Sequence, residues 1–400
     1  MTRFSILMLA PCPFPTRQGT QVFIRHLASA LASLHEVHLV TYGHGEYHHA
    51  DLPFHVHRAP RVATGLRSGP QPLKLLADAA MVRTAMGVLS RYPCALIHAH
   101  NVEGLAIALC IKNRTGHPIV YHAHNTMETE LPTYFRTRLA QRATALLGHV
   151  IDHTMVRHAD DVIVFDRDQR ALHEGFGVAS ARIHVIPPGL LSNEICLDNS
   201  ADTPWIRRKL GMGPWILYAG NPDGYQNLDL LWRALPLVRR ERPDVRLLVA
   251  CNHPETAFAA TLAAAGNPQG VTVQRYETLA ELRALFALAQ VGVSPRRLRP
   301  GAPIKVLNYL AAGVPVVACR RATRYIVGDG AGALVQDTPE AFAAGILHVL
   351  KGRFARSTVQ QGFASFRLER QRHLYLSVYR RCIARTRDTL KAPTTLSPRQ

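Results

Sequence analysis

Short apolar runs in the first half of the chain are each followed by a segment whose apolar positions have helical spacing. FSILMLA (4–10) precedes such a segment at 22–34, ALIHAH (95–100) precedes GLAIALCIKN, and DVIVF (161–165) precedes DQRALHEGF. EVHLVTY and PIVYHAH belong to the same series. Unbroken apolar runs of this length are typical of strands that are buried on both faces. Their alternation with helices predicts a parallel sheet covered by helices on both sides.

The alternation restarts after an irregular stretch that is rich in Asn, Asp and Ser. Further strands are predicted at PWILYAG, VRLLVAC, VTVQRY, VGVSP, VPVVA and GALVQ, with helical patterns between most of them. We therefore predict an α/β protein with two doubly wound, Rossmann-like parallel sheets that face each other across a cleft. The predicted parts are an N-terminal domain, a linker, a C-terminal domain, a helix that crosses back to the first domain, and a disordered tail, at 1–190, 191–213, 214–365, 366–388 and 389–400.

Length, hydropathy and cysteine content narrow the class of protein. The 400 residues exceed one ordinary core, which agrees with two domains. The chain has no run of about 18 uncharged apolar residues, so we expect no transmembrane helix. The run at 4–10 lacks a small-residue cleavage site, so we interpret it as a strand and not as a signal peptide. The seven cysteines are scattered and form no CxxC, which favours a reducing cytoplasm over disulfides or a zinc site.

The net charge of +19 is compatible with several classes of binding partner. Residues 351–400 hold twelve Lys or Arg and only two acids, and 133–158 alternate basic and apolar positions at roughly helical spacing. A basic amphipathic helix is typical of proteins that bind an anionic membrane surface, although an ordinary solvated helix or an arginine-rich composition gives the same pattern. Nucleic acid is not an expected partner, because the chain shows no recognition helix and no aromatic-basic motif.

Two HxH repeats, HAHN (98–101) and YHAHN (121–125), lie at the ends of predicted strands. Residues i and i+2 of a strand share a face, so His98 aligns with His100 and His122 with His124. Four histidines can bind a metal, but no carboxylate stands at ligand spacing and the chain has 21 histidines, so we expect no metal. The carboxyl end of a parallel strand is where ligands bind. This predicts that His100 and His124, with the adjacent Asn101 and Asn125, bind a polar substrate.

Two turns and one helix start are candidates for binding an anion. TRQGT (16–20) joins the first strand to a helix, and Gly19 with Thr20 can present backbone N–H groups there. It is not a GxGxxG, so a dinucleotide site is not expected. In RPGAPIKVLNYLAAG (299–313), a helix is predicted from Pro303 to Gly313, preceded by Gly301 and Ala302. The N–H groups at this helix start can point at phosphate oxygens.

These segments together resemble family-4 glycosyltransferases of the GT-B fold. The matching pieces, which run in the family's order over most of residues 3–345, are TRQGTQVFIRHLASAL, HEVHLVTYG, ALIHAHN, PIVYHAHN, ADDVIVFDRDQRALHEGFGVASARIHVIPPG, WILYAG and PIKVLNYLAAGVPVVA. The resemblance implies transfer of a sugar from a nucleotide-sugar, with retention of anomeric configuration, no cofactor and no obligatory metal. It implies an N-terminal acceptor domain and a C-terminal donor domain. The basic segments at 133–158 and 366–381 suggest a lipid-linked, glycan or other cell-envelope acceptor in a bacterium. We expect a cytoplasmic protein that is peripheral on the inner face of the membrane.

The resemblance also transfers roles to particular residues. The family's glycine loop matches Gly19 and Thr20, and its strand-end histidine, which touches the transferred sugar, matches His124. Its two diphosphate-clamping basic residues match Asn221 and Gln226, just after Gly220. Its two glutamates match Asn308 and a position at or next to Pro300. Four charged family positions are therefore neutral here.

We expect basic residues elsewhere to compensate for the missing clamps. The loop SPRRLRPGAPIK supplies Arg296, Arg297, Arg299 and Lys305, and Asn308 can still hydrogen-bond a ribose hydroxyl. We predict catalytic roles for His124, Lys305 and Arg297. Donor-binding roles are predicted for Gly19, Thr20, Gly220, Asn221, Gln226, Tyr276, Arg299, Gly301, Ala302 and Asn308, with Tyr225 or Tyr276 placed to stack on the base.

Two other functions remain open at this point. The neutral replacements are compatible with a GT-B protein that binds a nucleotide or glycan without catalysing transfer. Another GT-B enzyme, such as a sugar-nucleotide epimerase, would share the same fold and donor site.

Overall fold

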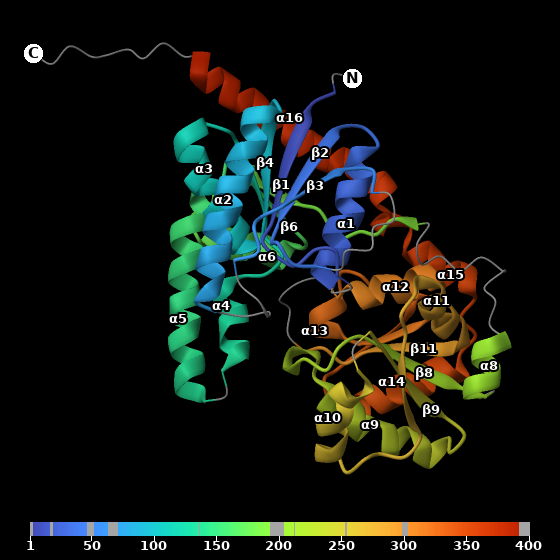
Figure 1. The fold of residues 1–400 in the computed structure, drawn as a ribbon. Helices are drawn as coiled ribbons and strands as arrows, with labels where there is room; N and C mark the ends of the chain where they lie inside the picture. Colours follow the sequence, from blue (N-terminus) through green and yellow to red (C-terminus); the bar gives the residue numbers. More distant parts are fainter. Residues whose placement is uncertain are drawn as a thin grey trace, which may run out of the picture. The chain divides into compact units, whose positions relative to one another are not determined.

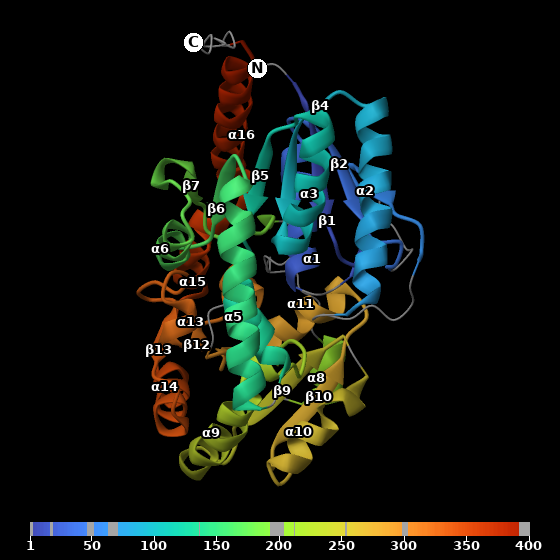
Figure 2. The ribbon, with the colours of Figure 1, turned by 90° about the vertical axis from the view of Figure 1, so that its left-hand side faces the viewer.

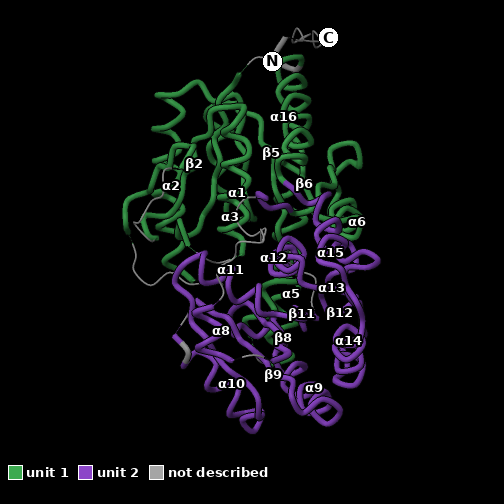
Figure 3. The backbone as a smooth tube through the Cα atoms, turned by 90° about the vertical axis from the view of Figure 1, so that its right-hand side faces the viewer, with its two compact units in different colours: residues 1–188, 368–400 green, residues 189–367 purple. Residues whose placement is uncertain are grey.

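The chain folds into two compact units, each built on one parallel sheet. The computed structural model describes residues 3–16, 19–45, 52–62, 71–135, 137–192, 204–211, 213–252, 254–297 and 303–391. Unit 1 comprises residues 1–188 and 368–400, and unit 2 comprises residues 189–367 (Figure 3). The described chain contains no helix that is both long and apolar enough to cross a membrane.

Unit 1 contains a seven-stranded sheet in the order β3-β2-β1-β4-β5-β6-β7, with every pairing parallel. Its strands are β1 (Ser5–Ala10), β2 (Glu36–Thr41), β3 (His55–Arg58), β4 (Cys94–His100), β5 (Ile119–His122), β6 (Asp161–Val164) and β7 (Ile183–Val185). Its helices are α1 (Gly19–Ala32), α2 (Leu73–Arg91), α3 (Asn101–Thr115), α4 (Met127–Glu130), α5 (Arg138–Met155), α6 (Arg167–Gly175) and α16 (Leu368–Lys391), with short 3-10 turns between some of them.

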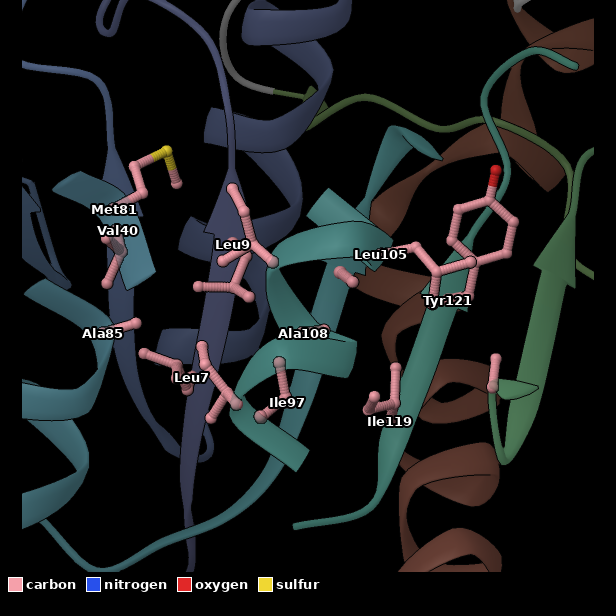
Figure 4. Packing of buried hydrophobic residues seen from close by; sticks show 14 of the residues in the cluster. Leu7, Leu9, Val40, Met81, Ala85, Ile97, Leu105, Ala108, Ile119 and Tyr121 are labelled. Carbon is pink, nitrogen blue, oxygen red and sulfur yellow. The ribbon is translucent and has the colours of Figure 1, made fainter. Parts of the chain in front are cut away.

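Side chains on alternate positions of these strands enter two different layers. Leu7, Leu9 and Ile97 pack with Leu105 and other residues of α2 and α3 in one core cluster (Figure 4). The intervening positions point to the other face, where α1 and α16 lie (Figure 1). Helices therefore cover both faces of the sheet, as the uninterrupted apolar strands predict.

Unit 2 contains a six-stranded parallel sheet in the order β10-β9-β8-β11-β12-β13. Its strands are β8 (Trp215–Ala219), β9 (Arg246–Cys251), β10 (Val271–Arg275), β11 (Ala289–Ser294), β12 (Val316–Cys319) and β13 (Gly332–Val335). Its helices are α8 (Pro204–Leu210), α9 (Leu228–Glu241), α10 (Ala259–Ala264), α11 (Leu279–Leu288), α12 (Ile304–Ala312), α13 (Arg320–Thr323), α14 (Pro339–Lys351) and α15 (Arg356–Gly362). Residues of α9 and α14 pack with β8, β9 and β11 in the second core cluster.

The two doubly wound parallel sheets confirm the predicted fold class. The structure adds three details that the apolar pattern did not give. Strand β3 pairs with β2, although its sequence HVHR has no apolar run. The range predicted as an irregular linker contains helix α8. The C-terminal helix belongs to unit 1 and continues to Lys391, so the predicted tail begins inside a helix, and its remainder, 392–400, lies outside the described residues.

Candidate donor and acceptor sites

The turn that follows β8 in unit 2 requires a glycine. Gly220 has a φ of 156°, and its N–H donates a hydrogen bond to the carbonyl of Ala250 at 3.0 Å. A Cβ atom at this position would lie 2.8 Å from Nζ of Lys305 and 3.1 Å from the hydroxyl of Tyr218. The absence of a side chain at 220 therefore lets Lys305, which comes from α12, approach the end of β8.

A chain of hydrogen bonds runs through this turn. Nζ of Lys305 donates to Oε1 of Gln226 at 2.7 Å, Nε2 of Gln226 donates to Oδ1 of Asn221 at 3.1 Å, and Nδ2 of Asn221 donates to Asp223 at 2.6 Å. Because an amide side chain both donates and accepts, Gln226 and Asn221 connect a cation to a carboxylate. These are the two positions at which the resemblance expects basic residues, and a lysine from another segment lies beside them.

The charge of Lys305 is poorly compensated in this position. Burial and the positive charge of Arg296 hold the pKa of Lys305 well below its usual value, and the carboxylate of Asp223 opposes this only in part. Nζ also lies 3.9 Å from the ring centroid of Tyr218, a cation–π contact that favours the ammonium form. An anion bound here would favour that form further.

The two arginines after β11 lie in different surroundings. Arg296 is 7 % exposed, and its guanidinium carbon lies 5.1 Å from the ring centroid of Tyr225. Arg297 is half exposed and forms an ion pair with Asp337 at 2.7 Å. Arg296 is the arginine whose charge acts on Lys305, and the catalytic role expected for Arg297 stays a prediction.

A hydrogen bond connects the turn after β8 with the arginine loop after β11. Nδ2 of Asn227 donates to the carbonyl of Pro295 at 3.0 Å, which ties the turn after β8 to the start of the arginine loop. Asn227 has a φ of 56°, a left-handed conformation that Asn tolerates better than most residues. Tyr276, predicted to stack on the base, directly follows β10, and its N–H donates to the carbonyl of Cys251 at 2.9 Å.

Helix α12 begins and ends as the sequence predicts, with Pro303 before its first residue and Gly313 in the left-handed conformation after its last. Oδ1 of Asn308 on α12 and Oγ of Ser294 at the end of β11 are buried without a hydrogen-bond partner among the described residues. Buried polar atoms usually have partners, so these two are candidates to bind a ligand. The predicted residues Arg299, Gly301 and Ala302 lie outside the described residues, as does Pro300.

In unit 1, the structure brings His100 and His124 together. Nδ1 of His100 lies 2.9 Å from Nε2 of His124, and both side chains are buried. Asn101, the first residue of α3, has a φ of 59°. Strain of this kind in a non-glycine residue is often found at functional sites.

The other predicted residues of unit 1 lie at two strand–helix junctions. Gly19 and Thr20 are the first two residues of α1. Nδ2 of Asn125 donates to Oε2 of Glu130 at 2.8 Å, while Oδ1 of Asn125 is buried without a partner. Burial raises the pKa of Glu130, although hydrogen bonds from Asn125 and Tyr134 oppose this. Asn125 is therefore held in place and retains a free acceptor atom.

Sequence reasoning gave no role to Asn227 or Glu130, and it did not distinguish Arg296 from Arg297 within the arginine loop. Arg296 and Arg297 are adjacent in a loop, where no periodicity indicates which side chain is buried. Asn227 directly follows Gln226, but its contact with Pro295 joins loops 68 positions apart. Glu130 lies beyond the HxH repeat, in a short helix without a repeated pattern.

Two sequence families match this chain, one on each part. Residues 18–189 match the family described as "Glycosyl transferase 4-like domain", and residues 213–352 match "Glycosyl transferases group 1". The two matches follow one another and together extend over most of the chain.

Two curated relatives carry glycosyltransferase names. A "D-inositol 3-phosphate glycosyltransferase" of Segniliparus rotundus is 24 % identical over 266 residues, which is 64 % of this chain and 58 % of that protein. A "GDP-mannose-dependent alpha-(1-6)-phosphatidylinositol monomannoside mannosyltransferase" of Mycolicibacterium smegmatis is 31 % identical over 172 residues, 40 % of this chain and 44 % of that protein. These alignments therefore span less than two thirds of either relative.

Solved structures share the fold at low sequence identity. A sucrose-phosphate synthase from Thermosynechococcus elongatus superimposes with a TM-score of 0.79 at 18 % identity, covering 96 % of this chain and 100 % of the other. Anabaena HepE in complex with UDP and glucose gives a TM-score of 0.69 at 16 % identity, covering 97 % and 100 %. The two family matches, which run from residue 18 to residue 352, place this chain among the family-4 glycosyltransferases of the GT-B fold, and the solved structures share that fold.

Proposed function

We propose that this glycosyltransferase transfers a sugar from a nucleotide-sugar donor to a lipid-linked, glycan or other cell-envelope acceptor, with retention of anomeric configuration. The observation that carries the donor proposal is the position of Lys305, which lies against Gln226 and near Arg296 with little compensating negative charge. A diphosphate is the ligand that two neighbouring cations of this kind would bind most strongly. The solved complex of Anabaena HepE contains UDP and glucose, which supports a nucleotide-sugar for the common fold.

Catalysis in this proposal is mainly electrostatic. The leaving nucleoside diphosphate gains negative charge as its bond to the anomeric carbon breaks. Lys305 and Arg296 are fixed before the reaction by the hydrogen bond to Gln226 and by the ring of Tyr225. Fixed cations stabilise developing charge without reorganisation, which is the usual origin of large rate effects. This step needs neither a cofactor nor a metal at the donor site.

The nucleoside part of the donor is assigned to the unpartnered atoms near α12. Oδ1 of Asn308 can accept a hydrogen bond from a ribose hydroxyl, and the buried Oγ of Ser294 offers a second polar group. A neutral amide suffices for this role because a ribose hydroxyl is an uncharged donor. Tyr276 supplies an aromatic ring beside β10 for the base.

The acceptor is assigned to unit 1, where His124, Asn101 and Asn125 lie at the carboxyl ends of β4 and β5. The two named relatives act on inositol 3-phosphate and on a phosphatidylinositol mannoside, so a phosphorylated or lipid-linked polyol is the first class to test.

Helix α5 favours an acceptor at a membrane. Leu139, Leu146, Leu147 and Val150 on this helix are between 49 % and 81 % exposed, and they lie near one another at helical spacing. Arg138 and Arg142 are exposed on the same helix, which faces the viewer in Figure 2. An exposed apolar stripe with flanking cations is typical of helices that lie in an anionic membrane surface. We therefore place the protein on the inner face of the cell membrane.

A thermal-shift screen with UDP, GDP, ADP and dTDP, followed by their sugars, tests the donor proposal. A ligand present at 100 times its dissociation constant stabilises a protein by about 2.7 kcal/mol, which is easily measured. A shift with one nucleotide identifies the donor class. Transfer of radiolabelled sugar to an inositol phosphate or phosphatidylinositol acceptor then tests the reaction. A protein that binds a nucleotide but transfers and hydrolyses no sugar would instead be a non-catalytic binder, and an epimerised donor would indicate another GT-B activity.

Sedimentation with vesicles tests the membrane proposal separately. We expect binding to vesicles that contain phosphatidylglycerol and little binding to pure phosphatidylcholine at low salt. Replacing Leu146 and Leu147 by Glu should abolish binding, whereas the same change at the exposed Leu374 of α16 provides a matched control. Equal sedimentation of all three proteins would contradict a role for α5.

A further inference from the structure

Three histidines of unit 1 form a buried cluster on the face of the sheet opposite to the α2–α3 layer. His98 and His100 lie on β4, and His122 lies on the neighbouring β5. All three are 0 % exposed, and one ring nitrogen from each lies within 4.8 Å of the others. The parallel register that pairs His98 with Val120 and His100 with His122 brings these side chains together.

The cluster contains more polar atoms than its neighbours satisfy. Nε2 of His98, Nε2 of His100 and both ring nitrogens of His122 are buried without a hydrogen-bond partner among the described residues. Aromatic rings surround them, with Phe165 5.1 Å and Tyr375 5.7 Å from His122 between ring centroids. A buried polar group without a partner costs roughly 1–3 kcal/mol, so a ligand that bound one nitrogen of each histidine would offset that cost for three of the four nitrogens.

The Nδ1 atoms of His98 and His100 have hydrogen-bond partners that fix the orientation of the two rings. Nδ1 of His98 lies 2.7 Å from the hydroxyl of Tyr379 on α16, and Nδ1 of His100 lies 2.9 Å from Nε2 of His124. If each Nδ1 carries the proton, both Nε2 atoms present lone pairs toward the cluster. Histidines that bind metals are usually fixed in this way, by a hydrogen bond from the second ring nitrogen.

We propose that His98, His100 and His122 bind a divalent transition-metal ion of the zinc class. Imidazole nitrogen is a good ligand for such ions, and three histidines with an open fourth position form a known type of zinc site. A metal–nitrogen bond length of about 2.1 Å requires ligand nitrogens about 3.4 Å apart, so the rings would move closer than the present limit of 4.8 Å when an ion binds. The sequence analysis expected no metal because no carboxylate lies nearby, but this geometry does not need one.

The ionisation of the cluster agrees with metal binding. Burial lowers the pKa of His98 to about 3 and lowers the pKa values of His100 and His122 well below their usual range. Burial therefore favours the neutral imidazole, which is the form that binds metals. A bound ion would also fix the proton of His100 on Nδ1 and make Nε2 of His124 an acceptor. The ion would then position His124 for the acceptor or sugar without contacting either.

Metal analysis of the full-length protein tests this inference. The protein is produced without a polyhistidine tag in medium supplemented with zinc, dialysed, and measured by mass spectrometry for Mn, Fe, Co, Ni, Cu and Zn. We expect close to one ion per chain. Protein produced with Co²⁺ should show the intense visible absorption of four-coordinate cobalt, which requires no variant.

Two variants locate the ion. His122→Gln keeps the side-chain volume similar but removes a ligand, and it should lower metal affinity by more than about tenfold. His173→Gln is the matched control, because His173 is also 1 % exposed with an unpartnered Nε2 but is no member of the cluster. Its metal content should equal that of the unchanged protein.

Three results would overturn the inference. They are a metal-free protein that melts cooperatively and takes up no ion on refolding with Zn²⁺ or Co²⁺, an equal loss of metal in both variants, and ordered water molecules bound to His122 in a crystal soaked with Zn²⁺. If His122→Gln fails to fold, the cobalt spectrum of the unchanged protein still decides between metal and water.

Discussion

Nζ of Lys305 lies 2.7 Å from Oε1 of Gln226, although the two residues are 79 positions apart in the chain. The family resemblance expects a lysine at 226, whereas this chain has its lysine on the facing helix α12. A lysine thus lies beside position 226 although it comes from a different segment, so the proposed donor site would not need a basic residue at 226 itself.

Exchanging the two side chains tests this explanation. Lys305→Gln should weaken nucleotide binding by one to two decades, because a hydrogen bond to a charged group contributes roughly 1.5–3 kcal/mol. The double variant Lys305→Gln with Gln226→Lys should recover much of that loss, since it returns the ammonium to the same place. Titration calorimetry with the nucleotide from the thermal-shift screen measures both. A double variant as weak as the single one would mean that the position of Lys305 itself, and not the charge, is required.

The two arginines after β11 should differ in their effect on donor binding. Arg296→Met removes the buried guanidinium near Tyr225 and should weaken nucleotide binding by about one decade or more. Arg297→Met breaks an ion pair with Asp337 that is about half exposed, so it should change nucleotide affinity much less. Lys351→Met, at an exposed ion pair with Glu241, controls for the loss of one positive charge. Equal losses in the two arginine variants would contradict the assignment to Arg296.

Nucleotide binding should be accompanied by proton uptake. The pKa of Lys305 is well below its usual value because of burial and Arg296, and a bound diphosphate would raise it. Between these two pKa values the complex holds more protons than the free protein, so affinity falls as pH rises through that window. Calorimetry in two buffers of different ionisation enthalpy measures the protons taken up. No dependence on the buffer would mean that Lys305 is already charged in the free protein.

The strands and α12 were predictable from the sequence, whereas the contacts at the site were not. Short apolar runs rich in β-branched residues, such as VPVVA, favour a buried strand, and Pro303 and Gly313 mark the ends of α12. The pairing of Lys305 with Gln226 depends on which strands are neighbours, and β8 lies beside β11 rather than β10. Local spacing contains no information about that order.

For the histidine repeats, too, the sequence predicts which residues share a face of a strand but not the contacts between strands. The i, i+2 rule correctly places His98 and His100 on one face of β4. That His122 joins them depends on the pairing of β4 with β5, and the unsatisfied nitrogens follow from what surrounds them, including Tyr375 from the far end of the chain. The expectation that no metal binds rests on the missing carboxylate and on the 21 histidines of the chain, and neither depends on this packing.

A buried carboxylate on α5 should make stability depend on pH. Burial raises the pKa of Asp152 to about 6, although its carboxylate accepts a hydrogen bond from the N–H of Glu128 at 3.0 Å. The folded state therefore binds more protons than the unfolded state between about pH 4 and pH 6, and stability falls as pH rises through that range. Asp152→Asn removes this effect and keeps an acceptor for Glu128.

The variant Asp152→Asn should be more stable than the unchanged protein above pH 6, by up to about 3 kcal/mol, and the difference should disappear near pH 4. Denaturant unfolding at pH 4, 6 and 8 measures it. Asp229→Asn, which removes an exposed carboxylate, serves as control and should show no such trend. A variant that is less stable at pH 8 would indicate that Asp152 is charged and stabilising in the folded protein.

The contact between α4 and α5 should tolerate no added atom at Gly148. A Cβ atom there would lie 2.3 Å from the backbone carbon of Met127 and 2.4 Å from the nitrogen of Glu128. Gly148→Ala must therefore push the helices apart, and it should destabilise the protein by about 1–3 kcal/mol despite the better helix propensity of alanine. Gly87→Ala on α2 is the matched control, because a Cβ atom at 87 meets nothing within 4 Å, and it should stabilise by about 0.5–1 kcal/mol. Because α5 carries the proposed membrane-binding stripe, vesicle sedimentation of Gly148→Ala would also show whether vesicle binding depends on the orientation of this helix. A protein with unchanged stability in Gly148→Ala would contradict the close packing of α4 against α5.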